Sequence, residues 1–240
     1  MKETEDINEV DISKVGALLA DPARAAMIIA LCGELALPAG ELAERAGISA
    51  STASIHLAKL VEAGWVVLEQ HGRHHYYRLT SPQIQNLLEQ AMALAPAKTS
   101  LQTGPERLPY QHADLRQART CYDHLAGKLG VALTDALRQR GALEVVDKDF
   151  YLTARGKALL QDLGVDVPAA ARQRRAFARC CLDWTERREH LGGALGATIC
   201  GAWLEQGWVQ RQDQTRALHV TSLGASQLPN WGIAWTGRIS

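Results

Sequence analysis

The stretch ELAERAGISASTASIHLAKLVEAG, residues 41–64, most narrowly limits what this chain can fold into. Gly47 is a natural left-handed stop for a first helix, and Ser49 or Ser51 can cap a second helix shortly afterwards. The second helix would bury an apolar stripe made of Leu57, Leu60 and Val61 and end at Gly64. Two helices around so short a turn, the second with small polar residues on its outer face, predict a helix-turn-helix.

The flanking segments extend this pattern. Asp21-Pro22 is a good start for a helix that runs to Gly33, because aspartate caps a helix and proline suits its first position. After Gly64, two β-rich arms around His71-Gly72 predict a hairpin. Ser81-Pro82 then begins one more helix. Helices followed by such a hairpin predict a winged helix-turn-helix over residues 1–95.

The runs LLADPARAAMIIALCG and ELAERAGISASTASIHLAKLVEAGWVVLEQHGRHHYYRLT resemble the ArsR/SmtB family of bacterial transcriptional regulators. The shared motifs are Asp-Pro-x-Arg, Glu-Leu-Ala before the turn, Ser-Thr-x-Ser-x-His-Leu in the recognition helix, and Gly-Arg with Tyr-Arg-Leu in the wing. The resemblance covers about residues 10–95. It implies a homodimeric repressor that places two recognition helices in successive major grooves of a palindromic operator in double-stranded DNA.

The resemblance also assigns DNA contacts, to phosphates or base edges, to the recognition-helix residues Ser49, Ser51, Thr52, Ser54 and Lys59. Short hydroxyl side chains allow a close approach and can donate to phosphates or to bases of either kind. Arg73 at the tip of the wing suits the minor groove or the phosphate backbone. Lys59 and Arg73 could instead be solvated surface charges. His56 matches the family position but faces near the buried stripe, so it suits a packing role at least as well as a DNA contact.

Charge is distributed unevenly and weakens the DNA-binding interpretation. Seven Lys and Arg against twelve Asp and Glu give residues 1–96 a net charge of −5, and residues 97–240 carry +5. Nucleic-acid binders usually present a basic face. The alternative is therefore a winged-helix module for protein–protein contacts that does not bind DNA. An enzyme is not expected, because the sequence has no glycine-rich phosphate loop, GxSxG or HExxH.

Composition predicts a reduced, cytoplasmic setting. The polar N-terminus lacks the features of a secretory signal, and no apolar run approaches the roughly 20 residues that span a bilayer. Five cysteines form no spaced disulfide framework, so we expect free thiols. Two metal sites of the ArsR/SmtB family have no match here, since ELALPAGELAE and SPQIQNLLEQAMALA lack the required cysteines, histidines or Asp-His pair.

The second half contains a repeat. A proline-rich linker, residues 96–111, leads to a C-terminal effector or dimerisation domain over residues 112–240. Its two copies cover about residues 112–166 and 168–232: ARTCYD is echoed by ARCCLD, and HLAGKLG by HLGGALG. Each copy predicts a long helix, a hairpin and a short helix, and glycines inside the long helices favour close helix packing. The fold class is mainly α with small β-hairpins (α+β).

The thiols of the repeats have three interpretations. On a helix Cys121 and His124 share a face and Asp123 points away. Cys121 and His124 together with Cys181 and His190 would make a two-Cys, two-His set suited to zinc or a similar transition metal. The extra residues WTERRE break the spacing in the second copy, which argues against a symmetrical four-ligand site. Cys180-Cys181 beside arginines could instead have lowered pKa values and sense oxidants. The thiols could also simply fill a core, and the tryptophans could line a pocket for a small-molecule effector or fill that core.

Overall fold

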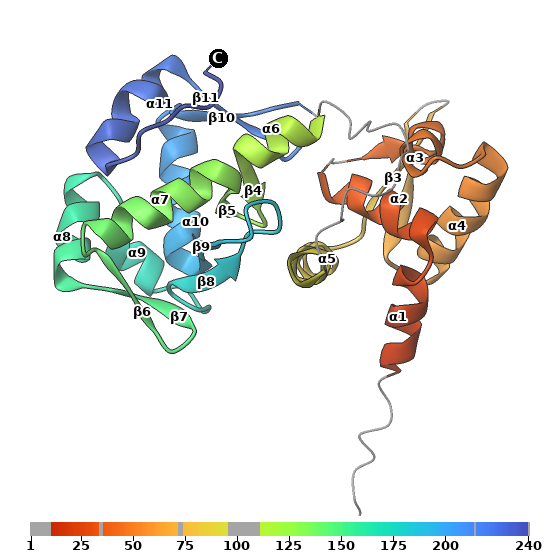
Figure 1. Ribbon diagram of the computed structural model, residues 1–240, viewed down its shortest axis with the longest axis horizontal. Coiled ribbons are helices and arrows are strands. Elements are labelled where there is room, and N and C mark those ends of the chain that lie inside the picture. Colours follow the sequence, from red (N-terminus) through yellow and green to blue (C-terminus); the bar gives the residue numbers. More distant parts are fainter. Residues whose placement is uncertain (1–10, 34–35, 72–73, 96–110, 214, 240) are drawn as a thin grey trace, which may run out of the picture. The chain divides into compact units, whose positions relative to one another are not determined.

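The computed structural model describes residues 11–33, 36–71, 74–95, 111–213 and 215–239 (Figure 1). The chain divides into two compact units, Met1–Gln85 and Asn86–Ser240. Helix α5, Pro82–Leu94, crosses this boundary, so its second half belongs with the C-terminal unit. The sequence instead placed all residues to 95 in the first domain. The linker predicted for residues 96–111 lies outside the described residues, except for its last position.

The N-terminal unit is a winged helix-turn-helix. Its elements are α1 (Ile12–Leu19), α2 (Pro22–Gly33), β1 (Leu37–Pro38), α3 (Ala39–Ala46), α4 (Ala50–Glu62), β2 (Val66–His71), β3 (His74–Leu79) and the start of α5. The strands form an antiparallel sheet in the order β1-β3-β2, with β2 and β3 as the wing. This confirms the helix-turn-helix and the hairpin, and the tip residue Arg73 lies outside the described residues.

Local capping explains the boundaries of these helices. The Asp21 carboxylate accepts a hydrogen bond from the Arg24 backbone N–H at 2.9 Å and so starts α2. The Arg24 side chain donates to the carbonyl oxygens of Leu18 and Ala17, at 3.0 and 2.6 Å, which satisfies the end of α1. The Asp-Pro-x-Arg motif therefore caps both the end of α1 and the start of α2.

The C-terminal unit runs through two similar series of elements. After α5 and α6 (Gln111–Gln117), the first series is β4 (Arg119–Cys121), β5 (His124–Ala126), α7 (Gly127–Gln139), β6 (Leu143–Val146), β7 (Asp149–Leu152) and α8 (Ala154–Asp162). Helix α9 (Val167–Ala171) precedes the second series, which is β8 (Arg179–Leu182), β9 (Glu189–Gly192), α10 (Gly193–Glu205), β10 (Val209–Arg211), β11 (Leu218–Val220) and α11 (Ser222–Gln227). A 3-10 turn, Leu228–Trp231, follows.

Each series begins with a hairpin that the sequence interpretation missed. The segments ARTCYD and ARCCLD were expected at the start of long helices, but they form β4 and β8, and the helices begin only at Gly127 and Gly193. The element order is therefore hairpin, helix, hairpin, helix in both series. A common origin of the two copies remains a prediction.

The glycines of the long helices permit two kinds of close contact, one with a neighbouring strand and one with a neighbouring helix. A Cβ on Gly130 would lie 2.3 Å from the carbonyl oxygen of Leu125, and one on Gly196 would lie 2.4 Å from that of Leu191. Both carbonyls belong to the strand just before the helix. The small residue at these two positions thus lets each helix fold back tightly onto its own hairpin. At Gly127 a Cβ would lie 2.8 Å from the carbonyl oxygen of Arg116, so this glycine does permit the predicted close approach of two helices, α6 and α7.

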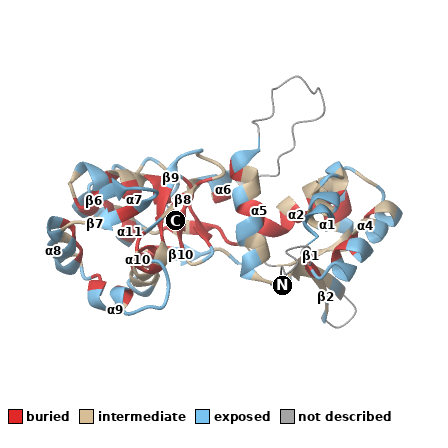
Figure 2. Cartoon of the chain, turned by 90° about the horizontal axis from the view of Figure 1, so that it is seen from below, coloured by how far each residue is buried: buried red, intermediate tan, exposed pale blue. Residues whose placement is uncertain are grey.

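The core of the C-terminal unit is built between the two series. Helix α10 packs against β5, and α7 packs against β9. The Thr134 hydroxyl accepts a hydrogen bond from the Leu191 backbone N–H at 2.8 Å, which ties α7 to β9. Trp203 and Trp231 are completely or almost completely buried with ring centroids 5.0 Å apart, so these two tryptophans fill the core. Figure 2 colours the buried segments of the chain red.

Within the described part of the chain, no single helix is both long and apolar enough to cross a bilayer. Only α1 taken jointly with Pro22–Cys32 meets those length and composition requirements, and the two are bent by 92°.

Candidate metal centre and DNA interface

Four buried side chains of the C-terminal unit converge on one point. They are Cys121, His124, Cys181 and His190, and one ligand atom from each lies within 4.8 Å of the other three. The two sulfurs are 3.9 Å apart, and the Nε2 atoms of the two histidines are 3.1 Å apart. The most exposed of the four, Cys181, is only 8% exposed. The cluster contains the donor atoms that zinc and related soft ions bind.

Backbone pairing places these donors. Cys121 and His124 are cross-strand partners in the β4–β5 hairpin, and Cys181 and His190 are partners in β8–β9. The helical arrangement predicted for Cys121 and His124 is therefore wrong: a tight turn with Tyr122 at φ 58° brings them together. Of the residues WTERRE, all but Glu189 lie in the loop of the second hairpin, and Glu189 begins β9. The insertion changes the spacing along the sequence but not the strand register, because Cys181 pairs with His190 as Cys121 pairs with His124.

The distances fit a tetrahedral ion. With Zn–S bonds of about 2.3 Å and Zn–N bonds of about 2.0 Å, tetrahedral geometry places two sulfurs about 3.8 Å and two nitrogens about 3.3 Å apart. The observed separations are 3.9 and 3.1 Å. Four side chains can therefore hold one ion with small shifts, whereas a disulfide would require the sulfurs to approach to about 2.05 Å.

The outer nitrogen of each histidine faces a carboxylate. The Nδ1 of His124 lies within hydrogen-bond distance of Asp123 Oδ1, at 3.4 Å, whereas the Nδ1 of His190 lies 3.6 Å from Asp183 Oδ2, an ion-pair distance without a hydrogen bond. Such carboxylates orient a metal-binding imidazole and fix which nitrogen carries the proton. The sequence interpretation set Asp123 aside because it assumed a helix; in the hairpin Asp123 points to His124 and also accepts from Arg175 at 2.6 Å.

Asp183 is the more strongly held of the two carboxylates. It is fully buried and accepts from the Arg119 guanidinium at 2.9 Å and from the Gly127 backbone N–H at 2.7 Å. Its other oxygen accepts from the Thr185 hydroxyl and the Thr185 and Glu186 backbones. Burial alone would raise the pKa of Asp183, but Arg119 and these hydrogen bonds hold it well below the ordinary value. Asp183 thus joins the second hairpin to the first.

Protonation in the cluster is set by mutual contacts. Burial lowers the pKa of His124, but the Asp123 carboxylate and the Cys121 sulfur outweigh this and raise it to about 9. The hydrogen bond with Cys181 and burial raise the pKa of Cys121, whereas the same contact lowers that of Cys181. These contacts favour the protonated forms of His124 and Cys121 in the metal-free site, and a cation that binds them has to displace those protons.

Glu89 on α5 completes the surroundings of the cluster, and no sequence pattern pointed to it. Its carboxylate is 2% exposed, accepts from the Cys121 thiol at 2.7 Å, and pairs with Arg216. Burial would raise the pKa of Glu89, but Arg216, Arg119 and the Cys121 thiol lower it below its ordinary value. Next to it, the Gln90 amide lies 3.8 Å from the Cys181 sulfur.

The remaining thiols do not join the cluster. Lowered pKa values were considered for the pair Cys180-Cys181 beside arginines. The pKa of Cys181 is lowered, but burial and a hydrogen bond with Glu189 raise that of Cys180 to about 12. Burial likewise raises the pKa of Cys200 to about 12. Cys32 is 1% exposed in α2, as expected of a small core residue.

The second helix of the helix-turn-helix, α4, presents a polar outer face. Ser49 caps it, with its hydroxyl 3.2 Å from the Thr52 backbone N–H and 2.8 Å from the Thr52 hydroxyl. Ser51, Ser54 and Lys59 are exposed. Val61, predicted to be buried with Leu57 and Leu60, is 40% exposed. His56 turns inward to Arg24, Nδ1 to Nη1 3.3 Å, which supports its packing role.

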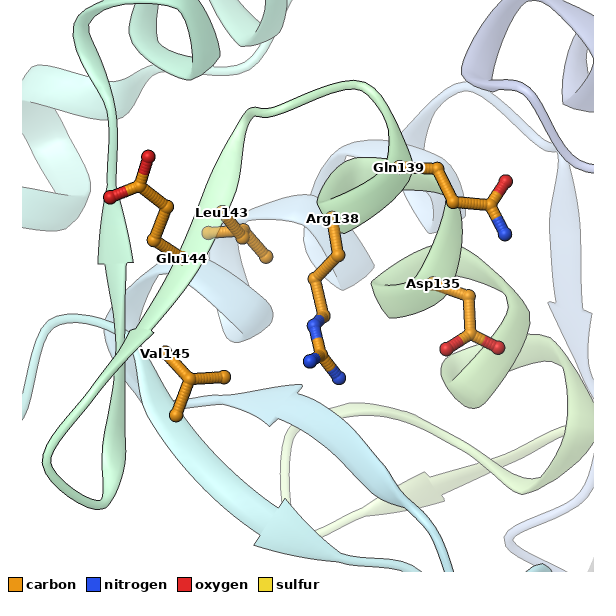
Figure 3. A pocket seen from close by; sticks show the side chains of 6 residues that line it. All are labelled: Asp135, Arg138, Gln139, Leu143, Glu144 and Val145. Atoms are coloured by element: carbon orange, nitrogen blue, oxygen red, sulfur yellow. The ribbon is translucent and has the colours of Figure 1, made fainter.

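An open depression elsewhere in the C-terminal unit is lined by Asp135, Arg138, Gln139, Leu143, Glu144 and Val145 (Figure 3). Two of its charges already have partners, since Arg188 binds Asp135 at 2.9 Å and Glu189 lies 3.9 Å from Arg138. This surface offers a weaker candidate site than the buried cluster.

The helix-turn-helix domain family matches residues 19–69. The uncharacterized HTH-type transcriptional regulator YdfF of Bacillus subtilis is 44% identical over 216 residues, covering 89% of this chain and 93% of that protein. The chain belongs to the ArsR/SmtB family of HTH-type transcriptional regulators. CmtR of Mycobacterium tuberculosis, another HTH-type regulator, is 32% identical over 83 residues, 35% of this chain and 70% of CmtR.

Among solved structures, the NMR structure of the cadmium metal-sensor CmtR is 30% identical and covers 40% of this chain and 99% of its own, with a TM-score of 0.31. As an ArsR/SmtB regulator the protein is a DNA-binding transcriptional regulator. The matched family domain ends at residue 69, before the first cluster residue, Cys121. The buried Cys and His side chains are thus an addition to the winged helix that this regulator shares with its family.

Proposed function

We propose that this regulator is a homodimeric repressor that releases a palindromic operator when a soft divalent metal ion binds Cys121, His124, Cys181 and His190. The convergence of these four donors within 4.8 Å carries the proposal. Two thiolates neutralise a divalent cation, so the buried site stays uncharged when filled. The carboxylates on the outer nitrogens add the support that such histidines usually have.

DNA binding is assigned to Ser49, Ser51, Thr52, Ser54 and Lys59 on α4, together with Arg73 of the wing. The exposed face of α4 supports this assignment, because the apolar stripe of the helix is turned inward. The net charge of −5 in residues 1–96 predicts modest non-specific affinity. Binding should therefore be measured on a fragment of the protein's own promoter over a range of salt concentrations.

Metal binding is tested by titrating the purified, reduced protein with Co²⁺ and following the sulfur-to-cobalt absorption band. We expect one ion per chain, displacement by Zn²⁺, and loss of the band in Cys121→Ser and Cys181→Ser. Cys180→Ser is the matched control, because its sulfur lies outside the cluster. The same proteins are then compared in gel shifts with and without Zn²⁺. An unaltered cobalt spectrum in both cysteine variants would exclude the site.

Thiol oxidation is the second candidate, favoured by the 3.9 Å sulfur separation and the lowered pKa of Cys181. A peroxide would take two electrons and two protons from Cys121 and Cys181, forming one disulfide and releasing water. Operator release by hydrogen peroxide in metal-free protein, absent in Cys121→Ser, would favour this mechanism. Absence of promoter binding at any salt concentration would instead favour the winged-helix module for protein–protein contacts.

A further inference from the structure

One turn of helix α5 contacts both sulfurs of the cluster. The Glu89 carboxylate accepts the Cys121 thiol at 2.7 Å, and the Gln90 amide donates toward the Cys181 sulfur at 3.8 Å. Both residues belong to the C-terminal unit, and the same helix begins within the N-terminal unit at Pro82. Helix α5 is thus the covalent continuation of the winged helix that touches the candidate ligands.

The contact with Glu89 depends on the state of Cys121. A sulfur that binds a metal ion gives up its proton to solvent and can no longer donate a hydrogen bond. The Glu89 Oε2 atom, 2.7 Å from this sulfur, would then lose its hydrogen-bond donor. Its other oxygen stays paired with Arg216, which is itself bound to the Thr120 carbonyl oxygen at 3.0 Å. Oε1 of the carboxylate would therefore stay bound to Arg216, while Oε2 would lose its contact with Cys121.

The end of α5 is anchored separately. Arg187, in the loop of the second hairpin, donates to the carbonyl oxygens of Met92 and Ala95 at 3.0 and 2.8 Å. These bonds cap the last turn of α5 and involve no cluster sulfur. A change at Glu89 is therefore expected to alter the docking of the middle of α5 while its end stays attached to the unit.

We propose that Glu89, assisted by Gln90, is the residue pair through which occupation of the cluster alters α5 and hence operator affinity. This inference rests on the proposed metal-responsive function. In this proposal Glu89 couples the metal site to α5 but is not itself a ligand of the ion. Linkage then requires that operator DNA weaken metal binding by the same factor by which metal weakens DNA binding.

The test uses Glu89→Gln in the full chain. Glutamine keeps the shape, loses the charge, and its amide can donate to a metal-bound sulfur. We expect the affinity for Co²⁺ to stay the same or rise, which a merely damaged fold would not produce. The coupling factor, the ratio of operator Kd values with and without Zn²⁺, is typically about 5–150-fold in allosteric proteins. In Glu89→Gln it should fall at least about fivefold toward 1.

Two further variants make the test decisive. Gln90 is exposed, so Gln90→Ala should fold normally and still lower the coupling factor. Glu205→Gln, on an exposed position at the end of α10, is the matched control and should leave the factor unchanged. Wild-type coupling in both α5 variants, with full cobalt binding, would overturn this inference alone. Absence of any metal effect on operator binding by the wild type would overturn the proposed function and this inference with it.

Discussion

Asp183 and Asp123 occupy equivalent positions in the two hairpins but very different surroundings, and this contrast makes a quantitative prediction. The Asp183 side chain and its partner Arg119 are both 0% exposed. Asp123 and its partner Arg175 are 37% and 31% exposed. Removing one member of a buried pair costs about 3–5 kcal/mol because the other charge is left unpaired, whereas exposed pairs contribute about 0–1 kcal/mol.

We therefore expect Asp183→Asn to lower the free energy of unfolding of the C-terminal unit by about 3–5 kcal/mol, and Asp123→Asn by no more than about 1 kcal/mol. In Asp183→Asn the amide keeps only one acceptor oxygen, whereas both oxygens of Asp183 accept hydrogen bonds, one from Arg119 and Gly127 and the other from Thr185 and Glu186. The amide N–H group must therefore face one of these two sets of donors, which loses its acceptor.

Urea unfolding of metal-free protein measures both variants. Tryptophan fluorescence reports on the correct unit, because five of the six tryptophans lie in the C-terminal unit. The midpoint should drop for Asp183→Asn with an unchanged slope. Equal losses in the two variants, or a loss below about 1 kcal/mol for Asp183→Asn, would refute the argument from burial.

Three further outcomes are expected. Replacing Ser51, Thr52 and Lys59 together by alanine should abolish operator binding in gel shifts while sedimentation shows an intact dimer; an unchanged shift would remove the recognition-helix assignment. In metal-free protein the raised pKa of His124 should contribute stability below pH 6.5 that is lost as the pH rises through about 9, and His124→Asn should flatten that part of the urea-midpoint profile. Asp183→Asn should also weaken Co²⁺ binding about 10–100-fold, measured by competition with a chelator, because His190 loses its orienting carboxylate.

The winged helix was predictable because its boundaries are set by neighbours in sequence. Asp21 and Ser49 cap the helices that follow them, and Gly47 takes φ 66° to end α3. These signals act over three or four residues and need no tertiary contact. Val61 escaped the same reasoning, since the width of a buried stripe depends on what packs against it, and here the helix leaves Val61 exposed.

The cluster was predictable in composition but not in geometry. Two cysteines and two histidines in repeated motifs identified the donor set. Their strand conformation was missed because the turn between Cys121 and His124 contains no glycine or asparagine. Tyr122 adopts the left-handed conformation there, and tyrosine is rarely found in that conformation in the turn of a β-hairpin. Tertiary pairing overrides that local preference.

Glu89 lay beyond sequence reasoning for a different reason. It occupies a helix whose neighbours suggest an ordinary amphipathic surface, and its partners Cys121 and Arg216 are 32 and 127 residues away. Only the fold shows that a carboxylate is buried against a candidate ligand. A buried carboxylate destabilises the fold unless other groups pair with it. The burial of Glu89 therefore depends on partners from the rest of the unit and cannot be deduced from the sequence of α5 alone.

The arrangement of ligands explains why a sensor would be built across two hairpins. Each hairpin supplies one sulfur and one imidazole, so neither series alone can complete a four-ligand site. An ion bound by all four would cross-link segments far apart in sequence and favour the state in which both hairpins are docked. Helix α5 lies on that junction through Glu89 and Gln90. An ion that holds the two hairpins together would therefore act next to α5, the helix that connects the C-terminal unit to the winged helix.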